Sequence, residues 1–217
     1  MNRIIMRNIQ LNEEARRTMV EQWRADDSDF CREAVERGWL TEEQMQRAAE
    51  RYRLGKSRSG RTIFWMIDEQ GVCRDGHIGD SWVSVMLKQR FPENAQYVRA
   101  EHCLFGLHFI SRSAQSVAIV EEERTAVVMS ELFPRYLWMA YGYLANFAVW
   151  QFEPLRGHRV VVFPKTDQTG SYYVMALEVA DQVHRRYGLD VTVSSVLEDG
   201  ATEEQKEREI DLLGFLF

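Results

Sequence analysis

Two apolar runs of strand type, each ending in a polar turn, constrain the fold of this chain most strongly. Residues 117–120 read Val-Ala-Ile-Val and are followed directly by Glu121. Residues 160–163 read Val-Val-Val-Phe and lead into a turn that contains Lys165 and Asp167. Short runs without polar positions are typical of strands that are buried on both faces, as in a parallel sheet covered by helices.

Helical patterns alternate with strand patterns in the second half of the chain. We expect a turn and a short helix after Tyr141. The other expected elements are strands at 117–120, 136–140, 160–163 and 191–196 and helices at 123–132, 172–187 and 202–213. This order predicts the α/β class, with a parallel sheet flanked by helices. Ligands of such sheets bind at the carboxyl ends of the strands, where Glu121, Gly142, Lys165 and Asp167 fall.

The first half of the chain is expected to be helical and then to form a β-hairpin. Apolar residues at helical spacing predict two helices; the residues are Leu11, Ala15, Met19 and Trp23 for the first and Phe30, Ala34 and Val35 for the second, which should end at Gly38. Thr41 and Gln44 have the spacing of a capping box and predict a third helix that runs to about Tyr52. Two strand patterns around the turn at 68–71 then predict a hairpin.

These patterns divide the chain into three regions. We expect a helical N-terminal region at 1–55, a hairpin-containing region at 56–112 and an α/β domain at 113–217. A chain of 217 residues with 45% hydrophobic residues is long enough for one sizeable domain with an appendage or for two small domains.

Composition limits the classes of function only loosely. The net charge of −6 argues against a generally basic nucleic-acid coat, although a local basic patch can still bind phosphate. Cys31, Cys73 and Cys103 are widely spaced and indicate neither a disulfide framework nor a structural zinc site. With neither a signal pattern nor an apolar run of about 20 residues, we expect a soluble, cytoplasmic protein without membrane contact and without an organic cofactor.

The two motifs that follow the apolar runs resemble the Toprim domain of DNA primases and topoisomerases. In that family a Glu follows the first strand, an Asp-x-Asp follows a later strand, and these carboxylates hold Mg²⁺ for phosphoryl transfer. The resemblance implies Glu121 and Asp167 as catalytic residues and metal ligands, with Asp211 as a looser third ligand. Residues from about 60 to 217 are most similar to uncharacterised Toprim-like proteins of bacterial mobile genetic elements.

The N-terminal half shows a weaker resemblance to phage-type and plasmid-type primases. It has matching segments in the family's order ahead of the Toprim motif, namely 37–41, 52–55, the hairpin and 104–106. Primases of this kind usually carry a zinc-binding segment before the catalytic core. The three cysteines of this chain do not provide one, although a separate subunit can supply it.

Two departures from the family pattern indicate a weakened catalytic site. Lys165 stands where the family has the first Asp of Asp-x-Asp, and Glu122 stands where a Gly usually follows the first Glu. A fixed cation within about 4 to 6 Å repels a metal ion and pairs with the carboxylates that should bind it. Mg²⁺ affinity should therefore be low, while the Lys165 ammonium remains able to contact a phosphate group.

One stretch of the chain is basic and predicts a strip that contacts the phosphates of nucleic acid. Its members are Arg47, Arg51, Arg53, Lys56, Arg58 and Arg61. The alternative is a solvated helix face followed by a linker.

Other candidate residues have plain structural alternatives as well. Glu121 and Asp167 can each be a helix cap or turn former without a further role. The aromatic segment that contains Trp138, Tyr141, Tyr143, Phe147 and Trp150 can stack on bases, but aromatic residues at this spacing are more often part of a core. The histidines at 77, 102, 108, 158 and 184 show neither metal-ligand spacing nor an evident nucleophilic partner.

The leading hypothesis is a catalytically weakened, nucleic-acid-associated accessory protein of a mobile element or DNA replication system, with DNA and a replication or mobilisation protein as partners. An active Mg²⁺-dependent primase or nuclease with a rearranged metal site is the first alternative. A protein-interaction module that uses the acidic segment from Glu198 to Asp211 is the second.

Overall fold

The computed structural model of the chain describes residues 27–97, 102–112, 114–142 and 147–217. They form two compact units, with the boundary between His108 and Phe109. The helical and hairpin segments that we assign to two regions, 1–55 and 56–112, thus lie mostly in one unit. The helix expected around residues 11–23 lies outside the described residues.

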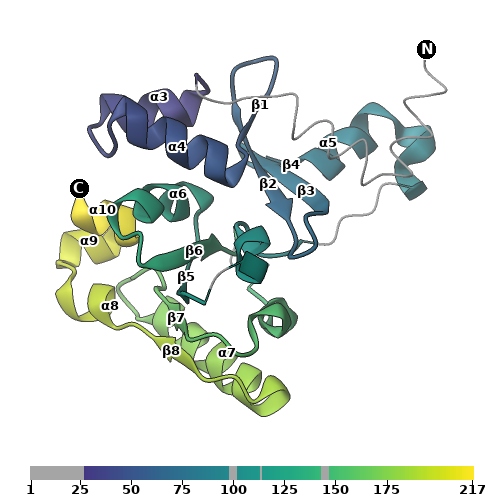
Figure 1. Ribbon diagram of the computed structural model, residues 1–217. Helices are drawn as coiled ribbons and strands as arrows, with labels where there is room; N and C mark the ends of the chain where they lie inside the picture. Colours follow the sequence, from purple (N-terminus) through teal and green to yellow (C-terminus); the bar gives the residue numbers. More distant parts are fainter. Residues whose placement is uncertain (1–26, 98–101, 113, 143–146) are drawn as a thin grey trace. The chain divides into compact units, whose positions relative to one another are not determined.

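The described part of unit 1 begins with two helices whose ends follow local signals (Figure 1). α3 (Asp29–Glu36) ends before Gly38, which has a φ of 69°. α4 (Glu42–Tyr52) begins at the capping box that the sequence predicts: the Gln44 amide donates to Thr41 Oγ1, and the Gln44 side chain accepts from the Thr41 amide. Both predicted helices are confirmed. The start of α4 could be predicted because a capping box joins residues only three apart.

The sheet of unit 1 is antiparallel and contains the predicted hairpin. Its strands, in spatial order, are β1 (Gly55–Lys56), β2 (Thr62–Ile67), β3 (Cys73–Ile78) and β4 (Ser81–Trp82). The turn between β2 and β3 is built on Asp68, whose Oδ1 accepts from the amides of Gln70 and Val72 and whose Oδ2 pairs with Arg74. The helices α5 (Val83–Arg90) and η1 (Pro92–Tyr97) follow.

Trp65 on β2 is held between two glycines of the neighbouring strands. A Cβ atom at Gly55 would lie 2.5 Å from Trp65 Nε1, and one at Gly76 would lie 2.7 Å from Trp65 Cε3. Trp65 is itself buried in a cluster with Ile63 and Ile67. The indole ring therefore occupies the space that a larger residue at either glycine would need.

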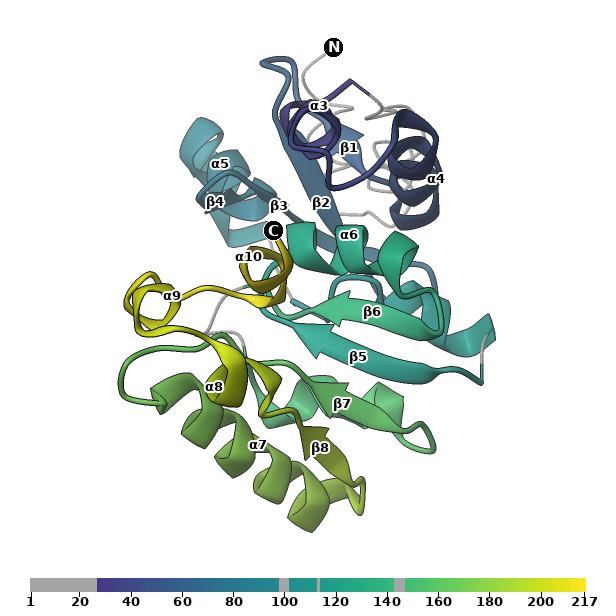
Figure 2. The same cartoon turned by 90° about the vertical axis from the view of Figure 1, so that its left-hand side faces the viewer.

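Unit 2 is built on a four-stranded parallel sheet. The helix η2 (Leu107–Arg112), which contains the boundary between the units, precedes it. The strands, in spatial order, are β6 (Tyr136–Ala140), β5 (Ser116–Val120), β7 (Val160–Val162) and β8 (Val191–Val193). Every neighbouring pair is parallel, as the sequence predicts, and Figure 2 shows the four strands side by side in this order.

Helices flank this sheet. α6 (Glu123–Leu132) packs against β5 and β6, while α7 (Ser171–Tyr187) packs against β8 and against the 3-10 helix η4 (Val149–Leu155). The chain moves from β5 to β6 in one direction across the sheet and from β7 to β8 in the other. Since both crossovers are right-handed in nearly all such folds, α6 and α7 belong to opposite faces of the sheet. The helix expected after Tyr141 corresponds to η4, and residues 143–146 before it lie outside the described residues.

The single helix expected at 202–213 is wrong. The segment contains α9 (Glu203–Glu207) and the start of α10 (Leu212–Leu216), preceded by α8 (Val196–Gly200). The break lies at Glu209, whose φ of 50° is in the left-handed region. The side chains of Thr202 and Asp211 each cap the start of a separate helix. Because Asp211 lies inside the range 202–213, this range is not one continuous helix.

Among the helices of the described segments, none is long and apolar enough to cross a membrane.

Candidate functional site

The strand order of unit 2 predicts a ligand-binding crevice at the carboxyl ends of β5 and β7. These strands are neighbours, and the chain leaves them in opposite directions, toward β6 and toward β8. Ligands of open α/β sheets bind at such a switch point, outside the carboxyl ends of the strands. Glu121 follows β5 directly and Lys165 follows β7 within three residues, so both flank the crevice.

Lys165 is the cation of this site, and it is paired with two carboxylates. Its Nζ lies 2.9 Å from Glu122 Oε1 and 3.9 Å from Glu121 Oε1. The Lys165 side chain is 17% exposed, so solvent screens these pairs only in part. Lys165 thus places its ammonium group beside the carboxylates of both Glu121 and Glu122.

Glu121 carries the least satisfied group of the site. The residue is 9% exposed, and its Oε2 atom is buried without a hydrogen-bond partner. Burial raises the pKa of Glu121, the positive charge of Lys165 opposes that rise, and the negative charges of Glu122 and Asp211 add to it. Nearby, burial and the charge of Glu121 raise the pKa of Tyr141 well above its usual value.

The pKa of Lys165 moves in the direction that keeps the ammonium charged. Burial alone would lower it, but the carboxylates of Glu122, Glu121 and Asp211 outweigh burial and leave it raised. Lys165 is therefore a permanent cation at neutral pH. It acts as an internal counter-ion for a cluster whose carboxylates outnumber it.

Asp211 folds back onto this cluster from the C-terminal end of the chain. Its Oδ2 accepts a hydrogen bond from Thr125 Oγ1 on α6, and its Oδ1 accepts from the Gly214 amide at 2.9 Å. Burial raises the pKa of Asp211, and these two hydrogen bonds oppose the rise. Of the three carboxylates that the resemblance implies as metal ligands, Glu121 and Asp211 thus share one charge cluster.

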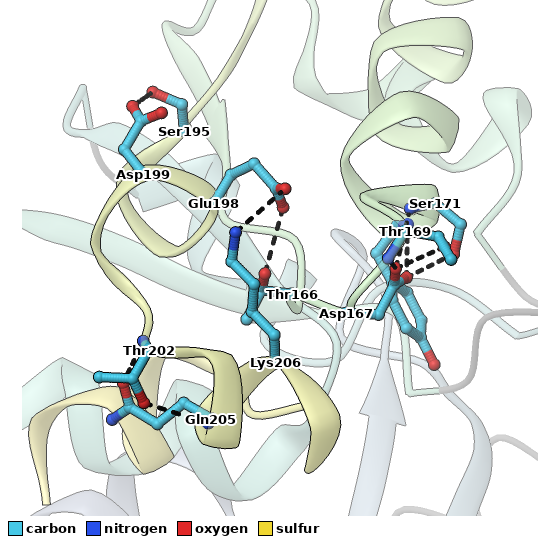
Figure 3. A network of polar contacts seen from close by, with 11 residues as sticks. Thr166, Asp167, Thr169, Ser171, Ser195, Glu198, Asp199, Thr202, Gln205 and Lys206 are labelled. Atoms are coloured by element: carbon cyan, nitrogen blue, oxygen red, sulfur yellow. Dashed lines mark hydrogen bonds and ion pairs between the residues drawn. The ribbon is translucent and has the colours of Figure 1, made fainter.

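Asp167 has a different role, which Figure 3 makes plain: its carboxylate points to Thr169 and Ser171. Oδ1 accepts from Thr169 N, Thr169 Oγ1 and Ser171 N, while Oδ2 accepts from Ser171 Oγ and Tyr172 N. Burial would raise the pKa of Asp167, but these hydrogen bonds hold it far below its usual range. With five donors on two oxygens, this carboxylate is engaged in closing the turn that begins α7, as the capping alternative describes.

The donor set fits a magnesium ion only poorly. Mg²⁺ prefers carboxylate oxygens in an octahedral arrangement with several waters, and Glu121 Oε2 is an oxygen still open to a ligand. The ammonium of Lys165 pairs with the same carboxylate. Within the part of the chain that the structure describes, no group of three or more Asp, Glu, His or Cys side chains is arranged to hold a metal ion. Cys31, Cys73 and Cys103 are buried and are not joined by disulfide bonds.

The basic strip that the sequence singles out lies in unit 1. Five of its six members are exposed, namely Arg47, Arg51, Arg53, Arg58 and Arg61. The sixth, Lys56, is half-buried and forms an ion pair with Asp27. The strip runs from α4, across its left-handed cap residue Arg53, to the turn between β1 and β2. Its arginines are accessible to a polyanion.

The aromatic segment is divided between core and surface. Trp138, Tyr141 and Phe147 are buried, which agrees with the core alternative, while Trp150 on η4 is 49% exposed. Tyr143 lies outside the described residues. Base stacking by the buried three would require unpacking of unit 2.

Sequence reasoning missed a polar cluster in unit 1. The buried carboxylate of Asp75 accepts from Ser84 Oγ at 2.6 Å, and its Oδ2 lies 2.9 Å from His102 Nε2. The His102 ring stacks on Trp82, with centroids 3.8 Å apart, and His77 stacks on the same indole at 4.8 Å. Asp75 and His102 are 27 residues apart, so no local spacing signals the pair.

A family model described as a domain of unknown function (DUF6371) matches residues 34–166, which is more than half of the chain. The matched segment includes Glu121 and Lys165 and ends one residue before Asp167. No curated protein and no solved structure matches the chain.

Proposed function

The chain belongs to the DUF6371 family, and we propose that it is a catalytically weakened, Toprim-like accessory protein that binds nucleic acid in a mobile genetic element or DNA replication system. The observation that carries the proposal is the ion pairing of Lys165 with Glu121 and Glu122 at the switch-point crevice. A parallel sheet with Glu121 directly after one central strand and a turn that contains Asp167 after its neighbour supports the Toprim comparison.

The loss of catalysis follows from the charges at the crevice. In a metal-dependent phosphoryl transferase, the carboxylates hold the metal and the metal offsets charge on the phosphate. Here a side-chain cation already neutralises part of the carboxylate charge, at 2.9 Å from one oxygen and 3.9 Å from another. A divalent ion would have to displace this ammonium or bind beside it, and both cost binding free energy.

The binding part of the proposal depends on the exposed arginines of unit 1. Neutralisation of DNA phosphates by Arg and Lys releases counter-ions and makes affinity fall as salt rises. Arg58 and Arg61 lie in and beside a turn of the β1–β2 hairpin, where the side chains are exposed. They are the best residues with which to test the strip, since their replacement leaves the helix α4 intact.

Binding of a fluorescent single-stranded oligonucleotide and of its duplex, titrated with salt in the presence of EDTA, tests the proposal. We expect binding at about 20 mM salt, and we expect the Arg58→Gln/Arg61→Gln pair to reduce the salt slope on single strands by roughly 1.4, twice the 0.7 of one phosphate contact. Arg185→Gln/Arg186→Gln on exposed positions of α7 is the matched control. Absence of binding at low salt, or an equal loss in the control pair, would overturn the proposal.

A second candidate function is an active Mg²⁺-dependent primase or nuclease with a rearranged site. The buried Glu121 Oε2 without a hydrogen-bond partner favours it, together with the fold-back of Asp211 into the same charge cluster. In this alternative Glu121 and Asp211 would hold the ion, and Asp167 would only cap α7. Primer synthesis or strand nicking by the wild type that is lost in Glu121→Gln would establish it, whereas activity that persists unchanged in Glu121→Gln would exclude this mechanism.

A further inference from the structure

Between α9 and α10, the chain passes along the carboxyl edge of the parallel sheet. We call Glu209, Ile210 and Asp211 the acidic strap. Figure 2 shows α9 and α10 at the end of the sheet toward which the strand arrows point. The strap follows Arg208 and ends where Asp211 caps α10, whose Leu212 and Leu213 are buried.

The strap is attached on both sides of the switch-point crevice. On the β5 side, Thr125 of α6 donates its hydroxyl to Asp211. On the β7 side, the Thr166 amide donates to the Ile210 carbonyl at 3.1 Å, and the Tyr172 hydroxyl donates to Glu209 Oε2 at 3.1 Å. Because its partners lie after β5 and after β7, the strap spans the crevice in which a sheet of this topology binds its ligand.

The groups that hold the strap are those that a phosphate would use. They are the hydroxyls of Thr125 and Tyr172 and the amide of Thr166, with the ammonium of Lys165 in the same cluster. The first turn of α6 also carries partial positive charge, and Asp211 is bonded to it. The strap meets these donors with carboxylate and carbonyl oxygens, which are the same kind of acceptor that a phosphodiester offers.

The strap begins at the C-terminal end of α9, where Glu209 has a φ of 50°. The Glu209 amide donates to the Lys206 carbonyl and the Ile210 amide donates to the Gln205 carbonyl, which is a common left-handed ending of a helix. Local hydrogen bonds therefore set this part of the backbone. The contacts with Thr166 and Tyr172 are what attach the strap on the β7 side, so their loss would loosen it there.

We propose that the acidic strap is an autoinhibitory occupant of the crevice and that a single-stranded nucleic acid displaces it by bringing phosphodiester groups to the donors of Thr125, Thr166, Tyr172 and Lys165. This inference rests on the proposed function, because it assumes that the protein binds nucleic acid. It adds a place of binding in unit 2 and the means by which that place is closed.

Two variants are expected to loosen the strap while the buried Leu212 and Leu213 of α10 stay unchanged. Tyr172→Phe removes the hydroxyl that bonds Glu209, and Glu209→Gln keeps the shape of that side chain but removes its charge. Glu204→Gln, on the exposed part of α9, is the matched control because it removes one acidic charge from the same region. Thermal melting of each variant verifies that unit 2 stays folded.

The experiment measures hydrogen exchange of the strap and affinity for a single-stranded oligonucleotide in EDTA at low salt. Exchange at the Thr166 amide should be at least about fivefold faster in Tyr172→Phe and Glu209→Gln and unchanged in Glu204→Gln. The two strap variants should bind the oligonucleotide roughly three- to tenfold more tightly than the control, and the oligonucleotide should increase exchange across residues 209–217 in the wild type.

The outcomes separate this inference from the proposed function. Binding of the oligonucleotide with equal affinity to all variants, with the strap still protected, would overturn the strap proposal and leave nucleic-acid binding intact. Absence of binding by the wild type and by every variant would overturn both. Binding by the strap variants alone would support the strap proposal, but it would contradict the binding by the wild type that the proposed function expects.

Discussion

Lys165 and Glu122 form an ion pair with 2.9 Å between Nζ and Oε1, at the carboxyl edge of a parallel sheet. Each residue departs from the Toprim pattern that the surrounding sequence resembles. The two departures compensate each other electrostatically, since Glu122 contributes to the raised pKa of Lys165. The first carboxylate, Glu121, lies 3.9 Å from the same ammonium.

Replacement of Lys165 by Asp should create or strengthen a Mg²⁺ site. The change removes the cation beside Glu121 and adds a carboxylate, so we expect the affinity for Mg²⁺ or Mn²⁺ to rise at least tenfold, or about 1.4 kcal/mol. Isothermal titration calorimetry measures it directly. Lys206→Asp, which removes the lysine that lies 3.8 Å from Glu198 instead, should leave the affinity unchanged. Comparable Mg²⁺ affinity in the wild type would favour the enzyme alternative.

Glu121→Gln should stabilise the protein at neutral and alkaline pH but not in acid. Because the pKa of Glu121 is raised in the folded state, folding favours the protonated form. That contribution is fully present below the ordinary pKa of about 4.3 and is lost as pH rises through the raised value. Gln removes the buried charge, so we expect a gain of about 1 kcal/mol at pH 8 and little change at pH 4.

Thermal melts at the two pH values measure this difference. A gain of that size corresponds to roughly 3 to 5 °C in a unit of this length. Glu122→Gln is the matched control: it removes the partner 2.9 Å from Lys165 and should not stabilise the protein at either pH. An equal effect of Glu121→Gln at pH 4 and pH 8 would show that the buried charge is not the cause.

Asp167→Asn should destabilise unit 2 without altering its metal affinity. An Asn at this position keeps one acceptor oxygen but turns an amide group toward donors such as Ser171 Oγ or Tyr172 N, so the loss of the cap should cost about 1 to 2 kcal/mol at pH 7. The pKa of Asp167 is lowered, so this contribution is fully present above the ordinary pKa of about 3.9 and is lost as pH falls below it.

The difference in unfolding free energy between wild type and Asp167→Asn should therefore shrink in acid. Denaturant titrations at pH 7 and pH 3 measure it. Asp190→Asn, at a side chain that is 92% exposed, should change stability by less than about 0.5 kcal/mol at either pH. If Asp167→Asn abolished the Mg²⁺ affinity gained by Lys165→Asp, Asp167 would be a metal ligand after all.

Gly76→Ala should destabilise unit 1 by overpacking. The added Cβ would lie 2.7 Å and 2.8 Å from two ring carbons of Trp65, and the indole has no space to retreat because Gly55 adjoins its other end. We expect a loss of about 1 to 3 kcal/mol. A double-mutant cycle with Trp65→Phe measures the coupling, and the smaller ring should remove much of the added cost. Full additivity of the two changes would contradict this steric explanation.

Local sequence patterns were sufficient to predict the helices and strands whose ends depend on residues nearby in the sequence. The capping box at Thr41 and the strand and helix at 116–132 are as expected because caps and apolar periodicity act within one or two turns. The expected helix at 202–213 was wrong although the signals that divide it are local as well. The Ile210 amide bonds the Gln205 carbonyl where α9 ends, and the Asp211 side chain accepts from the Gly214 amide where α10 begins.

The sequence by itself determined that unit 2 has buried parallel strands and that Glu121 and Lys165 stand at their carboxyl ends, since burial and strand direction follow from apolar runs joined by helices. Only the tertiary structure decided that β5 and β7 are neighbours and that Asp211 returns to Thr125 across 86 residues. Strand order and side-chain direction depend on how distant segments pack, and no local pattern specifies that packing. The same packing brings Glu121, Lys165 and Asp211 into one charge cluster.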